Sequence, residues 1–236
     1  MKTKAVFFDL DGTLLPMDQD LFIKEYFGRM AASIARHGYE PRKLIDVILK
    51  GTGIMIGNDG SRTNEQALWD YFCSVYGEEA RADMRLFELF YEQEFDEARA
   101  CCGRDERAAQ VIARVKERGL RAILATNPLF PPVATLKRIG WAGLRAQDFD
   151  LITTYDNSRF CKPNPKYFED ILSALDLRAE ECVMVGNDTS DDLSAAQLGM
   201  PVFILTDCLI NAKGVDLSSL PHGSFEQLFD WINALE

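Results

Sequence analysis

The stretch from Ala5 to Thr13 reads AVFFDLDGT and is the most informative part of the 236-residue sequence. It starts with a short apolar run rich in strand-forming residues, which predicts a buried β-strand. Asp9 and Asp11 follow at the carboxyl end of that run, and Gly12 favours a turn after them. Ligands of open parallel sheets bind at the carboxyl ends of the strands. The stretch therefore predicts a first strand that delivers two carboxylates to a functional site.

Strand-like and helix-like patterns alternate after residue 105. Further apolar runs typical of strands lie at 120–126, 149–154, 182–186 and 202–205. Amphipathic stretches separate these runs, and this alternation is typical of a parallel sheet covered by helices on both faces. The predicted fold class is therefore α/β, with a Rossmann-like parallel-sheet core formed by residues 1–15 and 105–236.

Residues 16–104 contain no convincing strand and several helical signatures. Apolar residues recur at steps of three and four between Leu21 and Ile34, and Pro41 is suited to open a second helix. Thr63 and Gln66 are spaced as a capping box at the start of a third helix. A fourth helix is predicted from about residue 79 to 98. These features predict an all-helical cap domain, residues 16–104, inserted after the first strand.

Composition and charge exclude several classes of function. The net charge of −11 argues against binding to a nucleic-acid backbone, which needs a clustered positive surface. No stretch approaches the roughly 20 apolar residues that a membrane span needs, so we expect no membrane partner and a cytoplasmic location. The six cysteines contain no C-x-x-C pair and are expected to be free thiols. The first strand also lacks the glycine fingerprint of nucleotide-binding dehydrogenases.

Polar side chains follow four of the predicted strands. They are Asp9, Asp11, Thr126, Asn127, Lys162, Asn187, Asp188, Asp191 and Asp192. Carboxylates can hold Mg²⁺, which prefers oxygen ligands, and a metal and a lysine together can neutralise phosphoryl oxygens. A carboxylate can then serve as a nucleophile, since an acyl phosphate is readily cleaved by water. This set of residues predicts phosphoryl-transfer chemistry.

The strand-end segments also resemble the ordered motifs of a known superfamily. They read DLDGT from Asp9, TN from Thr126, KPNP from Lys162 and VGNDTSDD from Val185. Their order and spacing resemble the four motifs of the haloacid dehalogenase-like (HAD) hydrolase superfamily, in its phosphatase branch. The helical segment resembles the cap that this superfamily carries between its first and second motifs. The resemblance covers nearly all of the predicted core.

The resemblance implies a role for each residue of the first three motifs. Asp9 would be the nucleophile that carries an aspartyl-phosphate intermediate. Asp11 would be the general acid that protonates the leaving group and later activates water. Thr126 and Asn127 would hold the phosphoryl oxygens, and Lys162 would steady both Asp9 and the phosphate.

The resemblance also implies a Mg²⁺ site. Asp9 and the backbone carbonyl of Asp11 would bind the metal, and Asp188 and Asp192 would help to fix it directly or through water. The sequence departs from the commoner G-D-x-x-x-x-D spelling, because Asn187 stands where the first aspartate is usual. Whether Asn187 or Asp188 faces the metal is open at this stage.

The expected function is Mg²⁺-dependent hydrolysis of a small phosphorylated metabolite. Asp11 favours phosphate esters, because dehalogenases and phosphonatases of the superfamily lack an acid at that position. A phosphomutase would use the same residues and remains an alternative, as does a non-catalytic regulatory or binding protein. Cap-loop positions such as Asn58 and Arg62 are expected to tune the choice of substrate.

Overall fold

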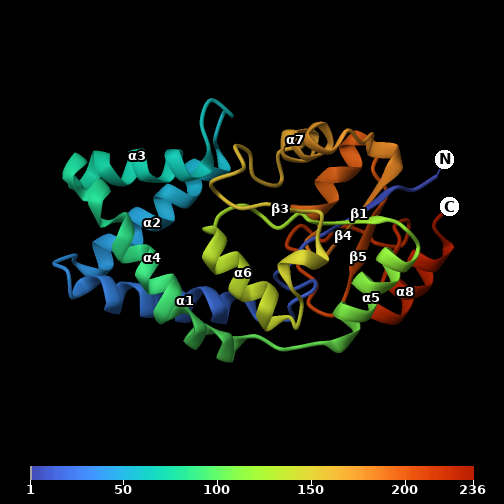
Figure 1. Cartoon of the computed structure of the whole chain (residues 1–236), viewed down its shortest axis with the longest axis horizontal. Helices are drawn as coiled ribbons and strands as arrows, with labels where there is room; N and C mark the ends of the chain where they lie inside the picture. The colour runs from blue at the N-terminus through green and yellow to red at the C-terminus, as the bar shows by residue number, and fades with distance from the viewer. Residues whose placement is uncertain (1) are drawn as a thin grey trace.

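A computed structural model describes residues 2–236 and divides into two parts, an α/β core and a helical unit beside it (Figure 1). The helical unit comprises α1 (Gln19–Ala35), α2 (Pro41–Ile56), α3 (Asn64–Tyr76), η1 (Glu78–Asp83), α4 (Met84–Gln93) and η2 (Phe95–Cys101). The strands are β1 (Ala5–Phe8), β2 (Arg121–Leu124), β3 (Leu151–Ile152), β4 (Cys182–Gly186), β5 (Val202–Leu205) and β6 (His222–Gly223). The remaining helices are α5 (Glu106–Glu117), α6 (Pro132–Trp141), η3 (Ala146–Asp148), α7 (Lys166–Leu175), η4 (Ala179–Glu181), η5 (Asp192–Leu198) and α8 (Phe225–Ala234).

The strands form one parallel sheet in the order β3-β2-β1-β4-β5-β6, which confirms the predicted α/β class. Ala5 of β1 pairs with Arg121 of β2 on one side and with Cys182 of β4 on the other. The chain builds outward from β1 through β2 and β3, then returns to add β4 next to β1. The strand order thus reverses at β1, and such switch points are where open α/β sheets bind ligands.

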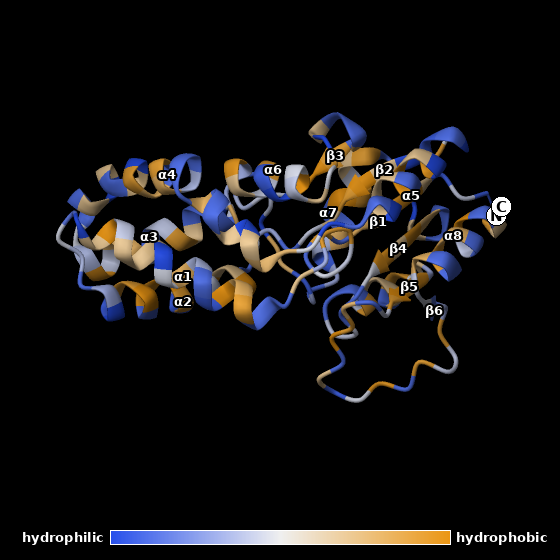
Figure 2. Cartoon of the chain, turned by 90° about the horizontal axis from the view of Figure 1, so that it is seen from below, coloured by the Kyte–Doolittle hydropathy of each residue, from blue (hydrophilic) through white to orange (hydrophobic). Residues whose placement is uncertain are grey.

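Both faces of the sheet are covered, as the uninterrupted apolar strands require. Val6 and Phe8 of β1 belong to a core cluster with α5, α6 and α8, whereas Ala5 and Phe7 pack on the other face with α7 and η5. All four side chains are fully buried. Strand β1 is therefore hydrophobic along its whole length, whereas the surrounding helices have mixed colouring (Figure 2).

The helical unit has an aromatic interior that joins the first core cluster. Phe22 and Tyr26 of α1 and Phe95 of η2 pack with tilted rings against Phe130, which follows β2 in the core. The predicted capping box of Thr63 and Gln66 is present at the start of α3.

None of the helices among residues 2–236 is long and apolar enough to cross a membrane.

Three elements differ from what the sequence pattern indicates. The fourth helix of the inserted segment is broken into η1, α4 and η2, so the continuous helix predicted there is wrong. The amphipathic stretch that follows β4 forms the 3₁₀ helix η5, which comes after a turn in which the Asp188 N–H donates to Asp192 and the Ser190 N–H donates to Asp188. The short strand β6 was not predicted, since two residues carry no periodicity that a sequence pattern could show.

Candidate active site

The loop after β1 is held in shape by its glycine. Gly12 has φ +82°, and a Cβ there would lie 2.3 Å from Nδ2 of Asn187, so only glycine fits. The turn lets the Thr13 hydroxyl donate to Oδ1 of Asn187 at 2.9 Å and approach Oδ2 of Asp9 at 3.3 Å. The loop therefore directs the Asp9 carboxylate over the end of β1.

Asp9 is buried and ion-paired with Lys162. The Lys162 ammonium donates to Oδ1 of Asp9 at 2.8 Å and to Oδ1 of Asp192 at 2.6 Å. Gly186 makes this arrangement possible, because a Cβ at that position would lie 2.1 Å from the Asp192 carboxyl group. Lys162 thus contacts Asp9, which lies 153 positions earlier in the sequence, and Asp192, which lies 30 positions later.

Carboxylates outnumber cations in this site, where Asp9, Asp11, Asp188, Asp191 and Asp192 lie around Lys162. Burial would lower the pKa of Lys162, but the carboxylates of Asp192 and Asp9 outweigh it and hold that pKa well above its usual value. Burial raises the pKa values of Asp192, Asp191 and Asp11, although positively charged neighbours oppose this shift. Too many carboxylates share too few cations, so a bound cation would stabilise the site.

Thr126 and Asn127 both lie at the end of β2 but differ in their contacts. The Thr126 carbonyl accepts from Thr153 and Tyr167, while its hydroxyl makes no hydrogen bond to residues 2–236. The Asn127 amide donates to Asp191 at 2.9 Å and accepts from the backbone N–H of Lys162 at 3.2 Å. The Thr126 hydroxyl is therefore available to a ligand, whereas the Asn127 side chain fixes the Lys162 segment.

Both ends of the Asn187 side-chain amide bind protein groups. Its oxygen accepts from Thr13, and its Nδ2 donates to the Cys208 carbonyl at 2.8 Å. In Asp188, Oδ1 accepts from the backbone N–H groups of Ser190 and Asp191, which leaves Oδ2 without a partner among the described residues. Of this neighbouring pair, Asp188 has the oxygen that is free to ligate.

Both carboxylate oxygens of Asp192 are also engaged. Oδ1 binds Lys162, and Oδ2 accepts from the Asp188 backbone N–H at 2.9 Å. Across residues 2–236, no three or more Asp, Glu, His or Cys side chains already converge as a metal-ligand set. The oxygen donors and the excess of negative charge nevertheless fit Mg²⁺ on chemical grounds.

These residues surround a polar chamber of about 100 Å³ at the carboxyl ends of β1, β2 and β4. Its lining residues are Asp9, Asp11, Gln19, Thr126, Asn127, Lys162, Asn187, Asp188, Asp191 and Asp192. All the predicted site residues are thus brought together. Gln19, the first residue of α1, is the one contribution from the helical unit, and the sequence pattern did not single it out.

Arg138 is a further residue of this region that sequence reasoning missed. It is 1% exposed in α6, forms an ion pair with Asp11 and stacks on the Phe130 ring at 4.1 Å. Its position one helical turn after Ala134 places it on the inward face of α6, and this spacing was the available signal. Asp11 Oδ1 is buried with no hydrogen-bond partner among the described residues, so Arg138 is its main protein contact.

Replacing Arg138 with methionine should destabilise the protein by about 3 kcal/mol, because it leaves the Asp11 carboxylate buried without its partner. Chemical denaturation measures this loss. The double variant Arg138→Met/Asp11→Asn should recover part of it, since an amide needs no counter-ion. If the losses in the free energy of unfolding from the two single substitutions simply added in the double variant, Arg138 and Asp11 would not stabilise each other.

The helical unit is anchored to the core by Asn64 at the start of α3. Its fully buried amide donates to the Pro128 carbonyl at 3.3 Å and to Sγ of Cys161 at 3.2 Å, and it accepts from Asn58. Asn58 is therefore part of this buried network, and Arg62 forms an ion pair with Asp70. Neither Asn58 nor Arg62 lines the polar chamber.

Comparisons with known proteins agree with this architecture. A sequence model of the haloacid dehalogenase-like hydrolases matches residues 3–199, which contain all four strand-end segments. Pyrophosphatase PpaX of Bacillus mycoides (strain KBAB4) is 23% identical over 199 residues, covering 84% of this chain and 81% of the relative.

Solved structures share the fold over the whole chain. A HAD phosphatase from Thermococcus onnurineus superposes with a TM-score of 0.59 at 20% identity, covering 99% of both chains. A putative beta-phosphoglucomutase from Thermotoga maritima gives a TM-score of 0.55 at 18% identity, covering 98% of this chain and 99% of the other. At these identities the similarity shows the fold alone, but the family match spans most of the chain. The protein therefore belongs to the haloacid dehalogenase-like hydrolase family.

Proposed function

We propose that the protein is a Mg²⁺-dependent phosphohydrolase that attacks small phosphate esters with Asp9. The observation that carries this proposal is the buried Asp9 carboxylate at the switch point of the sheet, held at 2.8 Å by the Lys162 ammonium. Lys162 orients the nucleophile and can neutralise an incoming phosphoryl oxygen. The adjacent Thr126 hydroxyl would donate to a second phosphoryl oxygen.

In the first step, an Asp9 oxygen would attack phosphorus and form an aspartyl phosphate as the ester oxygen leaves. Asp11, two residues on, would give its proton to that oxygen. Burial raises the pKa of Asp11, which favours the protonated form that an acid needs. In the second step the ionised Asp11 would take a proton from water as the water attacks the aspartyl phosphate.

The proposed metal ligands are Asp9, the backbone carbonyl of Asp11, and Asp188. Bound Mg²⁺ would supply charge neutralisation for the phosphoryl group and the clustered carboxylates. Asp192 would act indirectly, because its two oxygens hold Lys162 and the Asp188 backbone. Asn187 would shape the loop after β1 through Thr13.

Asp188→Ala should raise the Mg²⁺ concentration for half-maximal activity by about tenfold or more, because it removes a charged oxygen ligand. Titrating phosphate release against Mg²⁺ measures the shift, with EDTA-treated protein as the zero point. Asn187→Ala should instead lower thermal stability with a smaller change in Mg²⁺ demand. The opposite ranking would move the ligand assignment to Asn187.

Two alternatives are less well supported. A binding-only protein would not need Asp9, Asp11 and Lys162 together in one chamber. A phosphomutase must hold a sugar with several hydroxyl groups, and the cavity between the helical unit and the core loop after β2 is apolar. Multiple-turnover phosphate release without a bisphosphate activator is the experiment that tests hydrolysis, and absence of release from every phosphate ester and from pyrophosphate would refute it.

The helical unit would serve as a cap, with residues 16–104 as its approximate bounds. It enters and leaves the core beside the catalytic loop, where Met17 bridges to Cys102. Gln19 at its first helix lines the polar chamber. A cap in this position would exclude water from the reacting groups and limit the site to small substrates.

A further inference from the structure

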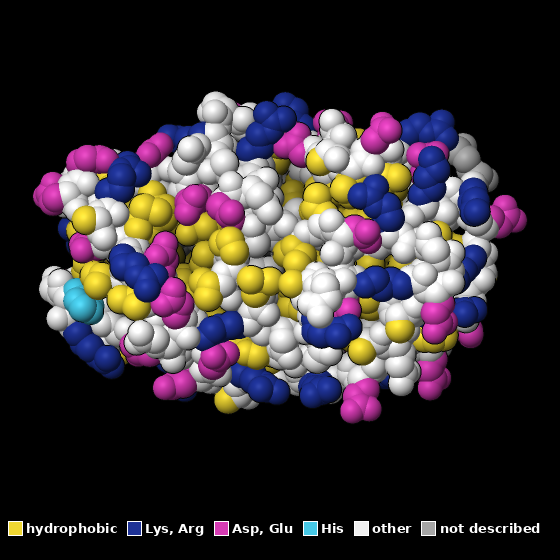
Figure 3. All heavy atoms as spheres, in the orientation of Figure 1, with side chains coloured by type: hydrophobic (Ala, Val, Ile, Leu, Met, Phe, Trp, Pro, Cys, Tyr) yellow, Lys and Arg dark blue, Asp and Glu magenta, His cyan; other side chains and the backbone are white. Residues whose placement is uncertain are grey.

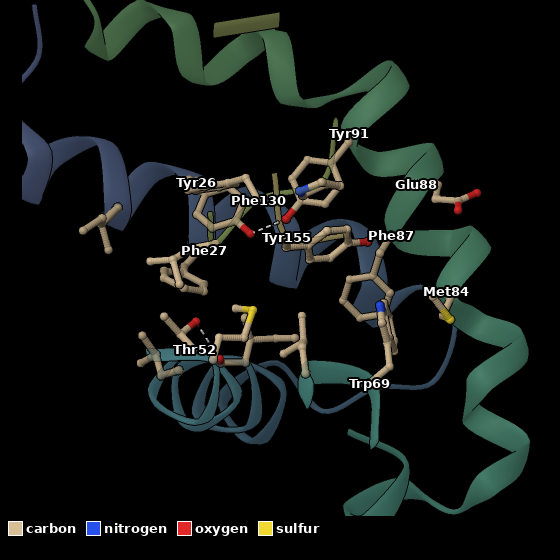
Figure 4. Close-up of a pocket in the computed structure, with 17 residues that line it drawn as sticks. Tyr26, Phe27, Thr52, Trp69, Met84, Phe87, Glu88, Tyr91, Phe130 and Tyr155 are labelled. Carbon is tan, nitrogen blue, oxygen red and sulfur yellow. Dashed lines mark hydrogen bonds between the residues drawn. The ribbon is translucent and has the colours of Figure 1, made fainter. Parts of the chain in front are cut away.

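An apolar cavity of about 180 Å³ lies between the helices of the helical unit and the core segment that follows β2 (Figure 4). It is lined by Ile23, Tyr26, Phe27, Ile48, Leu49 and Thr52, with further residues from α2, α3, α4 and the core segments 129–131 and 155. Its volume is comparable with cavities that hold one benzene ring. The cavity is separate from the polar chamber, and the proposed chemistry does not use it.

The cavity wall continues from the predicted phosphate-binding segment. Asn127 lines the polar chamber, and two residues later Leu129 lines the cavity, with its N–H donating to the Asn127 carbonyl at 2.8 Å. Phe130 forms another part of the wall, and its ring packs on Arg138, the ion-pair partner of Asp11. The walls of the polar chamber and of the cavity are therefore formed by neighbouring residues of one core loop.

The polar groups of the cavity offer little to a sugar. The hydroxyls of Tyr26 and Tyr91 bond to each other at 2.5 Å, and the Thr52 hydroxyl donates to the Ile48 carbonyl at 3.0 Å. Figure 4 shows these side chains around the empty space. Among the buried side-chain atoms of this lining that the structure describes, only the indole N–H of Trp69 lacks a hydrogen-bond partner, and it could bind a single acceptor atom. Glu88, also in the lining, accepts from Arg85 and would repel a second anionic group.

The surface beside the cavity is apolar too. Four of the six exposed large hydrophobic residues among those described lie on α1 and α2, namely Leu21, Ile23, Leu49 and Ile56. Ile23 and Leu49 also line the cavity and remain 44% and 48% exposed, whereas Leu21 and Ile56 do not line it. Hydrophobic side chains gather over the helical unit and toward the core on the face shown in Figure 3. Exposed apolar groups at a cavity mark a site for an apolar ligand.

We propose that this cavity binds the organic group of the substrate, so that the preferred substrates are phosphate monoesters with an apolar group about the size of one ring or a six-carbon chain. The proposal rests on the proposed phosphohydrolase function and adds the class of leaving group. Phosphorylated sugars and pyrophosphate would then be poor substrates, because neither can fill an apolar space.

Primary alkyl phosphates test this directly, because their alkoxide leaving groups have similar basicity and differ mainly in length. With Mg²⁺-loaded enzyme, kcat/KM should rise by up to about fourfold for each added methylene, the equivalent of about 0.8 kcal/mol per buried CH₂. The rise should stop once the chain exceeds the cavity. A flat profile from methyl to octyl phosphate, in an enzyme that hydrolyses them all, would overturn the leaving-group assignment and leave the hydrolase function intact.

The variant Thr52→Phe places a ring in the cavity without leaving a buried polar group unpaired. It should lower the ratio of kcat/KM for hexyl phosphate to that for methyl phosphate by about tenfold or more. Ile56→Phe adds a ring on the exposed side of the same helix and should keep the wild-type ratio. Equal ratios in wild type, Thr52→Phe and Ile56→Phe would overturn the proposal.

Binding of hydrolysis-resistant alkyl phosphonates gives a second readout that needs no turnover. Calorimetry with the Mg²⁺-loaded protein should give affinities that rise with chain length in wild type and in Ile56→Phe, but not in Thr52→Phe. If no phosphate ester is hydrolysed and phosphonates still bind with this dependence, the catalytic proposal fails while the cavity assignment stands. Affinities independent of chain length would overturn the cavity assignment.

Discussion

Asp9→Asn is expected to lower turnover by at least about 10³-fold while leaving the protein folded. An amide cannot form the acyl phosphate, and the loss of a covalent nucleophile removes the pathway rather than weakening a contact. Lys162 keeps Asp192 as a partner and can still donate to the oxygen of the introduced amide, so the midpoint of thermal unfolding should stay within about 4 °C of wild type. Phosphate release and a thermal melt on the same sample measure both quantities.

The matched control is Asp46→Asn, which makes the same chemical change in α2, away from the polar chamber. It should retain wild-type turnover. Acid quenching of wild type during turnover should also trap a phosphorylated protein that is absent from Asp9→Asn, as read by intact mass. Wild-type activity in Asp9→Asn, or an adduct that persists in it, would refute the nucleophile assignment.

The core was predictable because its strands are short and buried on both faces. In β1 and β4 every residue is buried, so an apolar run in the sequence marks the strand directly. The order of strands around β1 could not be derived in the same way, since it depends on pairings between segments more than 100 residues apart. The parallel class follows from the alternation of elements, but the register follows from three-dimensional packing.

The site residues were predictable as a set but not in their contacts. Asn187 and Asp188 are neighbours in sequence, and no local pattern tells which oxygen is already engaged by Thr13 or by a backbone N–H. Arg138 was missed because arginines in amphipathic helices usually face solvent. Here the buried carboxylate of Asp11, 127 positions away in sequence, explains its inward position.

The apolar cavity was hidden from the sequence for a related reason. Helical periodicity identifies which side chains of α1 and α2 face inward, but it does not tell whether they fill the space between the helices. The aromatic residues that line the cavity have the same spacing as residues of a closed core. If the cavity binds the organic group of the substrate, substitutions at Thr52, which lines it, should change specificity more than substitutions at Asn58 or Arg62.

Asp11→Asn is expected to separate the two chemical steps. Formation of the aspartyl phosphate from cyclohexyl phosphate should slow by about 10²-fold to 10⁴-fold, because the alkoxide needs a proton that an amide cannot give. With 4-nitrophenyl phosphate the first turnover should be nearly unaffected, since nitrophenolate leaves without protonation. Cleavage of the intermediate should still be slow in the variant, because Asp11 also activates water.

Rapid mixing can follow both steps with two esters that carry rings of similar size, so that cavity binding differs little between them. Asp11→Asn should give a burst of nitrophenolate close to one equivalent, followed by slow release of phosphate and accumulation of phosphorylated Asp9. Asp191→Asn, which removes another carboxylate from the same chamber, should change the rates for both esters by a similar factor. If Asp11→Asn likewise slowed the first turnover of both esters equally, Asp11 would serve only to position groups around Arg138, and the acid would have to be another residue.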